Sequence, residues 1–140
     1  MTLGASMSLS SVETFSAATS NLLPVMAQAE VKRLVVLTGI GAGDSRGHGG
    51  FMHDRVLLAV PLRSIYADKD RQEAMVTASD RAWTIVRPGF LTDAPATGKY
   101  RILTTMEGAT AAEISRADVA DFLLAQIDDE TYLRRTVYIG

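Results

Sequence analysis

The 140-residue sequence contains no cysteine, which excludes disulfides, thiolate catalysis and zinc sites built on cysteine. A large excess of charge of one sign is also missing, because 14 basic and 16 acidic residues leave a net charge of −2. Such a balance provides no general attraction to nucleic acid or to an anionic membrane surface. The composition therefore predicts neither nucleic acid nor a membrane as a partner.

Long hydrophobic runs are absent as well. The longest apolar run, Val56–Leu62, is far too short to span a bilayer and contains Pro61. Residues 1–31 contain no Lys or Arg, although a secretory signal requires a basic start followed by an unbroken apolar stretch. Ala27–Ala29 imitates the small residues of a cleavage site, but Pro24 interrupts the apolar residues before it. We therefore expect a cytoplasmic protein.

Strand-like and helix-like segments alternate along the chain. The continuous apolar run Leu34–Leu37 is typical of a strand covered on both faces in a parallel sheet. The amphipathic segment Asp68–Ser79 predicts a helix with Ala74, Met75 and Ala78 pointing inward. This alternation predicts an α/β fold with a three-layer, Rossmann-like parallel sheet. The expected strands are Arg33–Thr38, Trp83–Arg87, Tyr100–Thr104 and Thr136–Ile139.

Two helix starts are marked by the spacing of a capping box. In Ser10–Glu13 and in Ser115–Asp118 a serine precedes an acidic residue by three positions, so that each side chain satisfies a free backbone amide. Pro24 lies inside the first helix and is expected to kink or shorten it. The apolar faces are Val12, Phe15, Thr19, Leu22, Leu23 and Met26 in the first helix, and Val119, Phe122, Leu123 and Ile127 in the second.

The sequence begins with what reads as the end of a strand, Thr2–Gly4, followed by a small-residue loop and the first helix. In a doubly wound nucleotide-binding sheet, a glycine-rich turn after the first strand holds the cofactor phosphates. No such turn precedes Thr2. Residues 1–140 are therefore interpreted as a single partial NAD(P)-binding, Rossmann-like domain whose N-terminal βαβ units are missing.

Glycine-rich segments elsewhere are interpreted as loops. Gly39–Gly43 follows a strand, but the dinucleotide fingerprint needs a helix that begins on its glycines, and Asp44–Gly50 continues the loop instead. Leu91–Gly98, rich in Pro, Gly and Thr, is expected to be a second loop. His48 and His53 are five positions apart and do not share a helix face, so no metal site is predicted.

Three motifs stand in a recognisable order: Val31–Thr38, Trp83–Gly89 and Ile114–Ala120. Together they resemble the atypical short-chain dehydrogenase/reductase family, the NAD(P)H-binding oxidoreductases similar to flavin and biliverdin reductases. The resemblance implies hydride transfer from a nicotinamide cofactor, NADP or NAD, to a flavin-like or carbonyl substrate. It also implies that the pyrophosphate grip lies in the missing units, so we expect weak cofactor binding by this chain.

The resemblance implies catalytic roles for Thr38, Tyr66 and Lys69. Thr38 stands where the family has a Ser or Thr that hydrogen-bonds the substrate or nicotinamide; alternatively, it simply ends a strand. Lys69 corresponds to the lysine that holds the nicotinamide ribose; alternatively, it is a solvated helix lysine beside Asp70 and Glu73. Relatives place Tyr four positions before Lys, whereas Tyr66 precedes Lys69 by three. The offset rotates Tyr66 by about 100° on the helix, which makes it the weaker candidate for the proton donor.

Further cofactor contacts follow from the same resemblance. Arg87-Pro88-Gly89 resembles the family's turn that lays backbone atoms against the nicotinamide. The alternative is a plain strand terminator, because proline cannot continue a strand's hydrogen-bond ladder. The cofactor-binding residues implied in this way are Gly4, Thr38, Gly39, Lys69, Arg87, Pro88 and Gly89.

The sequence leaves distinct functions open. The first is an NAD(P)H-dependent oxidoreductase acting on a small molecule, impaired by the loss of the phosphate loop. The second is a non-catalytic interaction module, because Thr2–Gly4 as an exposed edge strand would pair with another copy of the chain. The third is a fragment without a function of its own. Neither the substrate nor the choice between NADH and NADPH can be inferred from these residues.

Overall fold

The computed structural model describes residues 1–4, 12–45, 48 and 62–140. The strands of its central sheet are β1 (Arg33–Leu37), β2 (Ala82–Pro88), β4 (Ile102–Leu103) and β6 (Arg135–Ile139). Their order in the sheet is β1-β2-β6-β4, with β4 antiparallel to β6 and the other pairs parallel. Leu34 lies opposite Trp83, and Val86 lies opposite Val137. The apolar runs thus form neighbouring parallel strands, as predicted.

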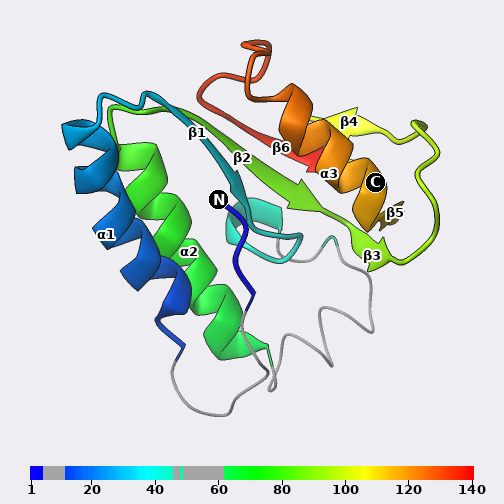
Figure 1. Ribbon diagram of the computed structural model, residues 1–140. Helices are drawn as coiled ribbons and strands as arrows, with labels where there is room; N and C mark the ends of the chain where they lie inside the picture. The colour runs from blue at the N-terminus through cyan, green and yellow to red at the C-terminus, as the bar shows by residue number, and fades with distance from the viewer. Residues whose placement is uncertain (5–11, 46–47, 49–61) are drawn as a thin grey trace.

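Helices cover both faces of this sheet. They are α1 (Thr14–Gln28), α2 (Arg63–Ala78) and α3 (Arg116–Ala125). The first two lie side by side against one face, and α3 lies against the other (Figure 1). Leu34 and Val36 pack into the core under α1 and α2, whereas Val35 and Leu37 pack toward the core under α3. The predicted three-layer α/β architecture is confirmed. Of the helices described, none is long and apolar enough to cross a membrane.

A second small sheet lies outside the sequence-based prediction. It consists of β3 (Phe90–Thr92) and β5 (Glu113–Ser115), which pair in parallel. The prediction of a loop over Leu91–Gly98 is therefore wrong for its first residues. Each strand has only three residues, which is too short for an alternating pattern to be visible in the sequence.

The start of α1 differs from the predicted capping box. Ser10 lies outside the described residues, and Glu13 occupies the N-cap position without a side-chain cap. The free amides are satisfied from α2 instead. The fully buried carboxylate of Asp68 accepts hydrogen bonds from the Phe15 amide at 2.8 Å and from the amide and hydroxyl of Ser16. The cap of α1 therefore depends on contact between the two helices.

Other helix predictions have mixed outcomes. Helix α1 continues past Pro24, which therefore does not shorten it. The second capping box is confirmed, because the Ser115 hydroxyl accepts a hydrogen bond from the Asp118 amide at 2.9 Å. Ile127 lies beyond the end of α3 and is 55% exposed, so its inward assignment is wrong.

Helix α2 buries a largely polar face. Ala74 and Ala78, predicted to point inward, are exposed. The buried positions are Ile65, Asp68, Gln72, Glu73 and Val76. The prediction is wrong because it followed the apolar residues alone, whereas the buried polar side chains here bind groups on neighbouring elements.

The segment Thr2–Gly4 does not form the predicted strand end. The backbone of Met1 lies beside β1 instead. There the Leu37 amide donates to the Met1 carbonyl at 3.0 Å, and the Met1 amine donates to the Val35 carbonyl. Met1, rather than Thr2–Gly4, therefore lies next to β1.

The cap that Asp68 provides can be tested by substitution. Asp68→Ala leaves the buried amide of Phe15 without its acceptor, so we expect a loss of about 2 kcal/mol in the free energy of unfolding. Urea denaturation measures this change. Asp121→Ala, at an exposed position of α3, is the control and should cost no more than about 0.5 kcal/mol. Equal losses in the two variants would contradict the capping role.

Candidate functional site

Thr38 follows β1 at the carboxyl edge of the sheet, the edge at which ligands bind in open α/β folds. Its amide continues the ladder by donating to the Val86 carbonyl at 2.9 Å. Its buried hydroxyl donates to Glu73 Oε1 at 2.6 Å, and its carbonyl accepts from Lys69 Nζ at 2.6 Å. Thr38 thus holds two side chains of α2 at the end of the strand.

Lys69 and Tyr66 converge on Gly39. A Cβ atom placed on Gly39 would lie 3.4 Å from Lys69 Nζ and 3.4 Å from the Tyr66 hydroxyl. Lys69 Nζ also lies 5.2 Å from the ring centroid of Tyr66 and 5.5 Å from that of Phe15. The structure therefore brings together the three residues proposed as catalytic, Thr38, Tyr66 and Lys69, with Gly39 beside them.

The Lys69 ammonium is not a solvated surface group. Burial lowers the pKa of Lys69 to about 8, although the nearby charge of Glu73 acts in the opposite direction. A lysine with this pKa is partly neutral just above physiological pH. It can therefore act as a hydrogen-bond donor to a ligand or exchange a proton in this range.

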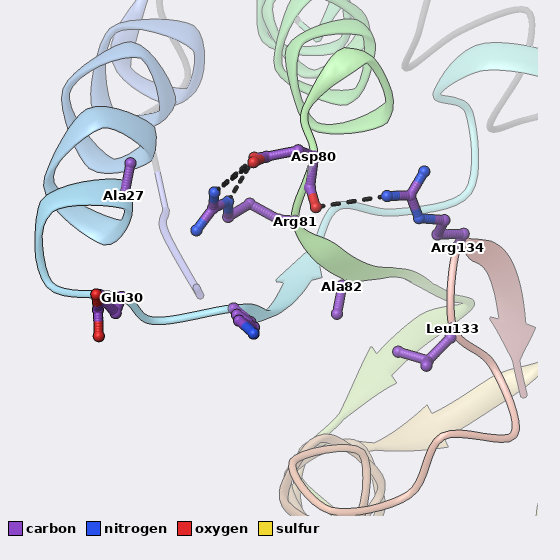
Figure 2. A pocket seen from close by; sticks show the side chains of 8 residues that line it. Ala27, Glu30, Asp80, Arg81, Ala82, Leu133 and Arg134 are labelled. Atoms are coloured by element: carbon purple, nitrogen blue, oxygen red, sulfur yellow. Dashed lines mark hydrogen bonds and ion pairs between the residues drawn. The ribbon is translucent and has the colours of Figure 1, made fainter.

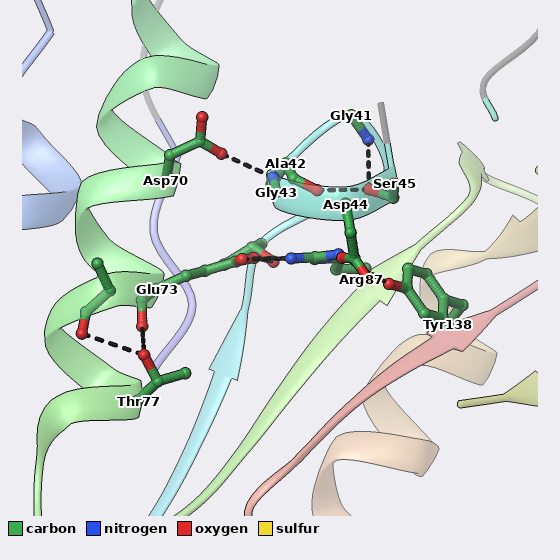
Figure 3. A network of polar contacts seen from close by, with 12 residues as sticks. Gly41, Ala42, Gly43, Asp44, Ser45, Asp70, Glu73, Thr77, Arg87 and Tyr138 are labelled. Atoms are coloured by element: carbon green, nitrogen blue, oxygen red, sulfur yellow. Dashed lines mark hydrogen bonds and ion pairs between the residues drawn. The ribbon is translucent and has the colours of Figure 1, made fainter. Parts of the chain in front are cut away.

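Arg87 forms the centre of a buried polar network (Figure 3). Its Nε and Nη2 atoms donate to the two carboxylate oxygens of Glu73 at 3.0 and 2.5 Å. Its Nη1 atom donates to the Tyr138 hydroxyl at 2.8 Å and pairs with Asp44. The Tyr138 hydroxyl in turn donates to Asp44 at 3.0 Å. The guanidinium is occupied on every nitrogen, so its side chain has a structural role.

The network shifts the pKa values of its members. Burial alone would lower the pKa of Arg87, but hydrogen bonds and charge attraction from Glu73 outweigh it and raise that pKa above its usual value. Burial raises the pKa of Tyr138 to about 12. Burial acts to raise the pKa of Asp44, yet the bonds from Arg87 and Tyr138 hold it below its usual range. At neutral pH the network therefore contains the Arg87 guanidinium, the Asp44 carboxylate and the neutral Tyr138 phenol.

The predicted turn at Pro88 and Gly89 lies beside the end of β1. The Pro88 carbonyl accepts a hydrogen bond from the Ile40 amide at 3.2 Å, and the Gly89 amide donates to Ile139 at 2.9 Å. A Cβ atom on Gly89 would approach the Ala112 carbonyl oxygen to 2.0 Å. Only glycine fits this position, whatever further role its backbone has.

Gly4 has a different environment from the other glycines proposed to bind the cofactor. It is exposed, and within the described residues no heavy atom beyond Gly4 and its chain neighbours lies within 4 Å of the Cβ position. Nothing described in its surroundings connects Gly4 with Thr38, Gly39 or Lys69, so a cofactor contact at Gly4 stays a prediction.

The glycines after β1 do not open an α-helix. They lead into the short 3₁₀ helix η1 (Gly43–Ser45), which agrees with the interpretation of this segment as a loop rather than a dinucleotide fingerprint. Gly43 has a φ of +53°, and a Cβ atom there would lie 2.4 Å from Arg87 Nη2. His53 lies outside the described residues. Among those described, no group of three or more His, Asp or Glu side chains could hold a metal ion.

Sequence reasoning missed the residues that hold this site together. Glu73 follows Lys69 by four positions, so the helical repeat alone places the two on neighbouring positions of one face. No such signal exists for Asp44 or Tyr138, which lie 43 and 51 residues from Arg87 in the chain. Their contacts arise only from the folding of the sheet.

Comparison with known proteins agrees with this architecture. The sequence model of a family described as NAD(P)H-binding matches residues 1–130, and the chain therefore belongs to that family. This match confirms the NAD(P)H-binding part of the resemblance to the atypical short-chain class. A search of curated proteins finds no match.

Solved structures share the fold at low sequence identity. ChuY from Escherichia coli, described as an anaerobillin reductase, has a TM-score of 0.77 at 20% identity, covering 93% of this chain and 60% of its own. A short-chain dehydrogenase/reductase from Veillonella parvula in complex with NADP has a TM-score of 0.68 at 21% identity, covering 91% and 58%. The oxidoreductase ylbE from Lactococcus lactis has a TM-score of 0.71 at 24% identity, covering 87% and 52%. The chain thus spans between 52% and 60% of these three structures.

The pKa of Lys69 gives a direct test of the site. We expect the Cε–H NMR signals of Lys69 to titrate with a midpoint near pH 8, because burial lowers the pKa to about 8. Lys69→Arg removes this signal and so assigns it. A midpoint above about 10, the ordinary range for lysine, would contradict the buried position of the ammonium.

The pH dependence of the free energy of unfolding should also reveal the lowered pKa of Lys69. The pKa of Lys69 in the folded chain, about 8, is lower than the ordinary lysine value of 10.5, so between these pH values the unfolded chain binds more protons. The Lys69 contribution to the free energy of unfolding therefore increases as the pH rises through this window, by about 3 kcal/mol. Comparison with Lys69→Met isolates this contribution from other titrations.

Proposed function

We propose that this chain provides the nicotinamide- and substrate-facing part of an NAD(P)H-dependent oxidoreductase. The reaction is hydride transfer from the nicotinamide to a small flavin-like or carbonyl substrate. The observation that carries the proposal is the convergence of Thr38, Tyr66 and Lys69 on Gly39 at the carboxyl end of β1. In an open α/β sheet, ligands bind outside this edge.

The described residues fit a nicotinamide nucleoside. Gly39 has no side chain, and a Cβ there would lie 3.4 Å from both Lys69 Nζ and the Tyr66 hydroxyl. Lys69 offers a cationic donor suited to a ribose hydroxyl, and the backbone at Pro88 and Gly89 stands at the next strand end. A bound NAD(P)H would supply the hydride. The choice between NADH and NADPH stays open.

Each proposed residue has a separate task. Lys69, anchored on the Thr38 carbonyl at 2.6 Å, holds the ribose. The Thr38 hydroxyl gives its only hydrogen to Glu73, so it orients a ligand by accepting a hydrogen bond from it. Tyr66 stays the weaker candidate for the proton donor, because it lies three and not four positions before Lys69. The backbone of Pro88 and Gly89 forms a wall of the nicotinamide pocket.

Cofactor affinity should come mainly from the nicotinamide half. The glycines after β1 lead into a 3₁₀ helix, so these residues do not provide the α-helical N-terminus that binds a pyrophosphate. We therefore expect weak binding of the whole dinucleotide by this chain. Submicromolar binding of NADPH in calorimetry would overturn the proposal that this chain lacks the pyrophosphate-binding loop.

Two ligands that each represent one half of the cofactor distinguish nicotinamide binding from general nucleotide binding. Reduced nicotinamide mononucleotide should shift the amide NMR signals of Thr38, Gly39 and Gly89, with a dissociation constant on the order of 1 mM. Adenosine 2′,5′-bisphosphate should leave these signals unchanged. Lys69→Met should weaken mononucleotide binding about tenfold through the loss of a charged hydrogen bond.

Lys99→Met is the matched control, because Lys99 is exposed in the loop before β4. It should bind the mononucleotide as the unchanged chain does. The proposal fails if the three amide signals do not respond to the mononucleotide, or if the two lysine variants lose affinity equally.

We also propose a second candidate function, self-association along the β1 edge. A groove of about 1000 Å³ lies beside this strand, between α1 and the end of α3. Arg33 is the only charged side chain among its lining residues, and it is bound to the Gln126 and Ala82 carbonyls. Val25, Leu124 and Ile127 along the groove are 57%, 64% and 55% exposed. A second copy of the chain carries the same exposed apolar side chains, and a two-fold symmetric contact would bury both sets.

Light scattering across a wide dilution series tests this association. The mass should increase with concentration for the unchanged chain, and Leu124→Glu should hold it at the monomer value because a charge would be buried at the contact. Ala96→Glu adds the same charge at an exposed loop position and should behave as the unchanged chain. A clean monomer at the highest concentration would rule out this candidate.

A further inference from the structure

A separate cavity lies at the opposite edge of the sheet from Thr38 and Lys69. It has a volume of about 750 Å³ and opens where the loops enter the amino-terminal ends of β1 and β2 (Figure 2). Its walls come from the end of α1, the loop after α2 and the loop before β6. The lining residues are Ala27, Glu30, Lys32, Asp80, Arg81, Ala82, Leu133 and Arg134.

Three cationic side chains from three separate loops meet at this cavity: Lys32, Arg81 and Arg134. The two acidic residues in the lining are Glu30 and Asp80. The Asp80 carboxylate is already engaged by Arg81 through Nε and Nη2, each at 2.7 Å. The positive charges of Lys32 and Arg134 therefore exceed the charge that Glu30 can balance.

Arg81 is held in place before any ligand arrives. Its side chain is only 12% exposed. In addition to the two bonds to Asp80, its Nη1 atom donates to the Val31 carbonyl at 2.9 Å. Arg134 approaches Asp80 from the other side and donates to its carbonyl at 3.4 Å (Figure 2). Three hydrogen bonds thus fix the Arg81 side chain, whereas Arg134 is exposed and makes a single hydrogen bond of 3.4 Å.

Two residues in the lining adopt a backbone conformation that disfavours side chains. Glu30 has a φ of +55° and Arg134 a φ of +53°, and they are the non-glycine residues with positive φ in the described chain. Glycine adopts this region without strain, whereas other residues pay a steric penalty there. Arg134 therefore places a cationic side chain at the cavity, at a position where glycine would be more stable. Such strain is characteristic of functional positions.

We propose that this cavity binds the oxyanion group of a small molecule, a phosphate or a carboxylate. The Arg134 guanidinium matches the planar, bidentate geometry of both anions, and Lys32 adds a point charge. The volume exceeds that of an isolated phosphate and is in the range of small-molecule sites. Ala27, Ala82 and Leu133 offer apolar surface to the rest of the molecule. This site is separate from the nicotinamide site and does not rest on it.

NMR titrations with inorganic phosphate and with citrate test the proposal in the whole chain. At least one anion should shift the backbone amides of Lys32, Arg81 and Arg134, with a dissociation constant on the order of 1 mM. The stronger of the two identifies the class of ligand. Binding should weaken as salt is added, because the attraction is electrostatic.

Substitutions separate binding from folding. Arg134→Gly should weaken anion binding about tenfold, yet raise the midpoint of thermal unfolding because it relieves the positive φ. Lys32→Met should also weaken binding, and Glu30→Gln should strengthen it by removing a nearby negative charge. Arg101→Met, at an exposed position outside the lining, should leave the affinity unchanged.

Several outcomes would overturn the site. These are the absence of amide shifts with either anion, an equal response of Arg134→Gly and Arg101→Met, or shifts that lie outside the cavity. Anion binding that also shifts the amide signals of Thr38 and Gly39 would place the ligand at the nicotinamide site. This result would equally contradict the proposal.

Discussion

The buried ion pair between Arg87 and Glu73 is the interaction on which the candidate site depends. A charge removed from water is tolerated only when a partner and hydrogen bonds compensate it. Both carboxylate oxygens of Glu73 accept from Arg87, and one of them also accepts from Thr38. The pair thus connects β2 to α2 and to the end of β1. Loss of either charge would leave the other without its buried partner, and loss of Glu73 would also remove the hydrogen-bond acceptor of Thr38.

Lys69 is connected to that pair through Thr38. Glu73 accepts a hydrogen bond from the Thr38 hydroxyl, and the Thr38 carbonyl accepts one from the Lys69 ammonium at 2.6 Å. Burial then lowers the pKa of Lys69 to about 8, while the negative charge of Glu73 limits the decrease. The Glu73 carboxylate therefore binds the residue that anchors the lysine and also limits the effect of burial on its pKa.

Much of the fold can be predicted from the sequence, because buried parallel strands give continuous apolar runs such as Leu34–Leu37. The location of Thr38 and Lys69 at one edge follows from strand direction and helix position. The buried face of α2 could not be predicted in the same way. Its polar side chains serve partners far away in sequence, as Asp68 does for Phe15, 53 residues distant. Likewise, the need for glycine at position 89 becomes visible only when the Ala112 carbonyl lies against it.

The two edges of the sheet use charge in different ways. At the carboxyl edge Arg87 and Glu73 are buried and paired and so have a structural role, and the Lys69 ammonium lies close to the strand end. At the amino edge, Lys32 and Arg134 are exposed, and their interaction with a ligand is screened by salt. Parallel strands of a well-packed core connect the two edges and do not deform continuously. We therefore expect recognition at the carboxyl edge to depend on fixed geometry and recognition at the amino edge to vary with ionic strength.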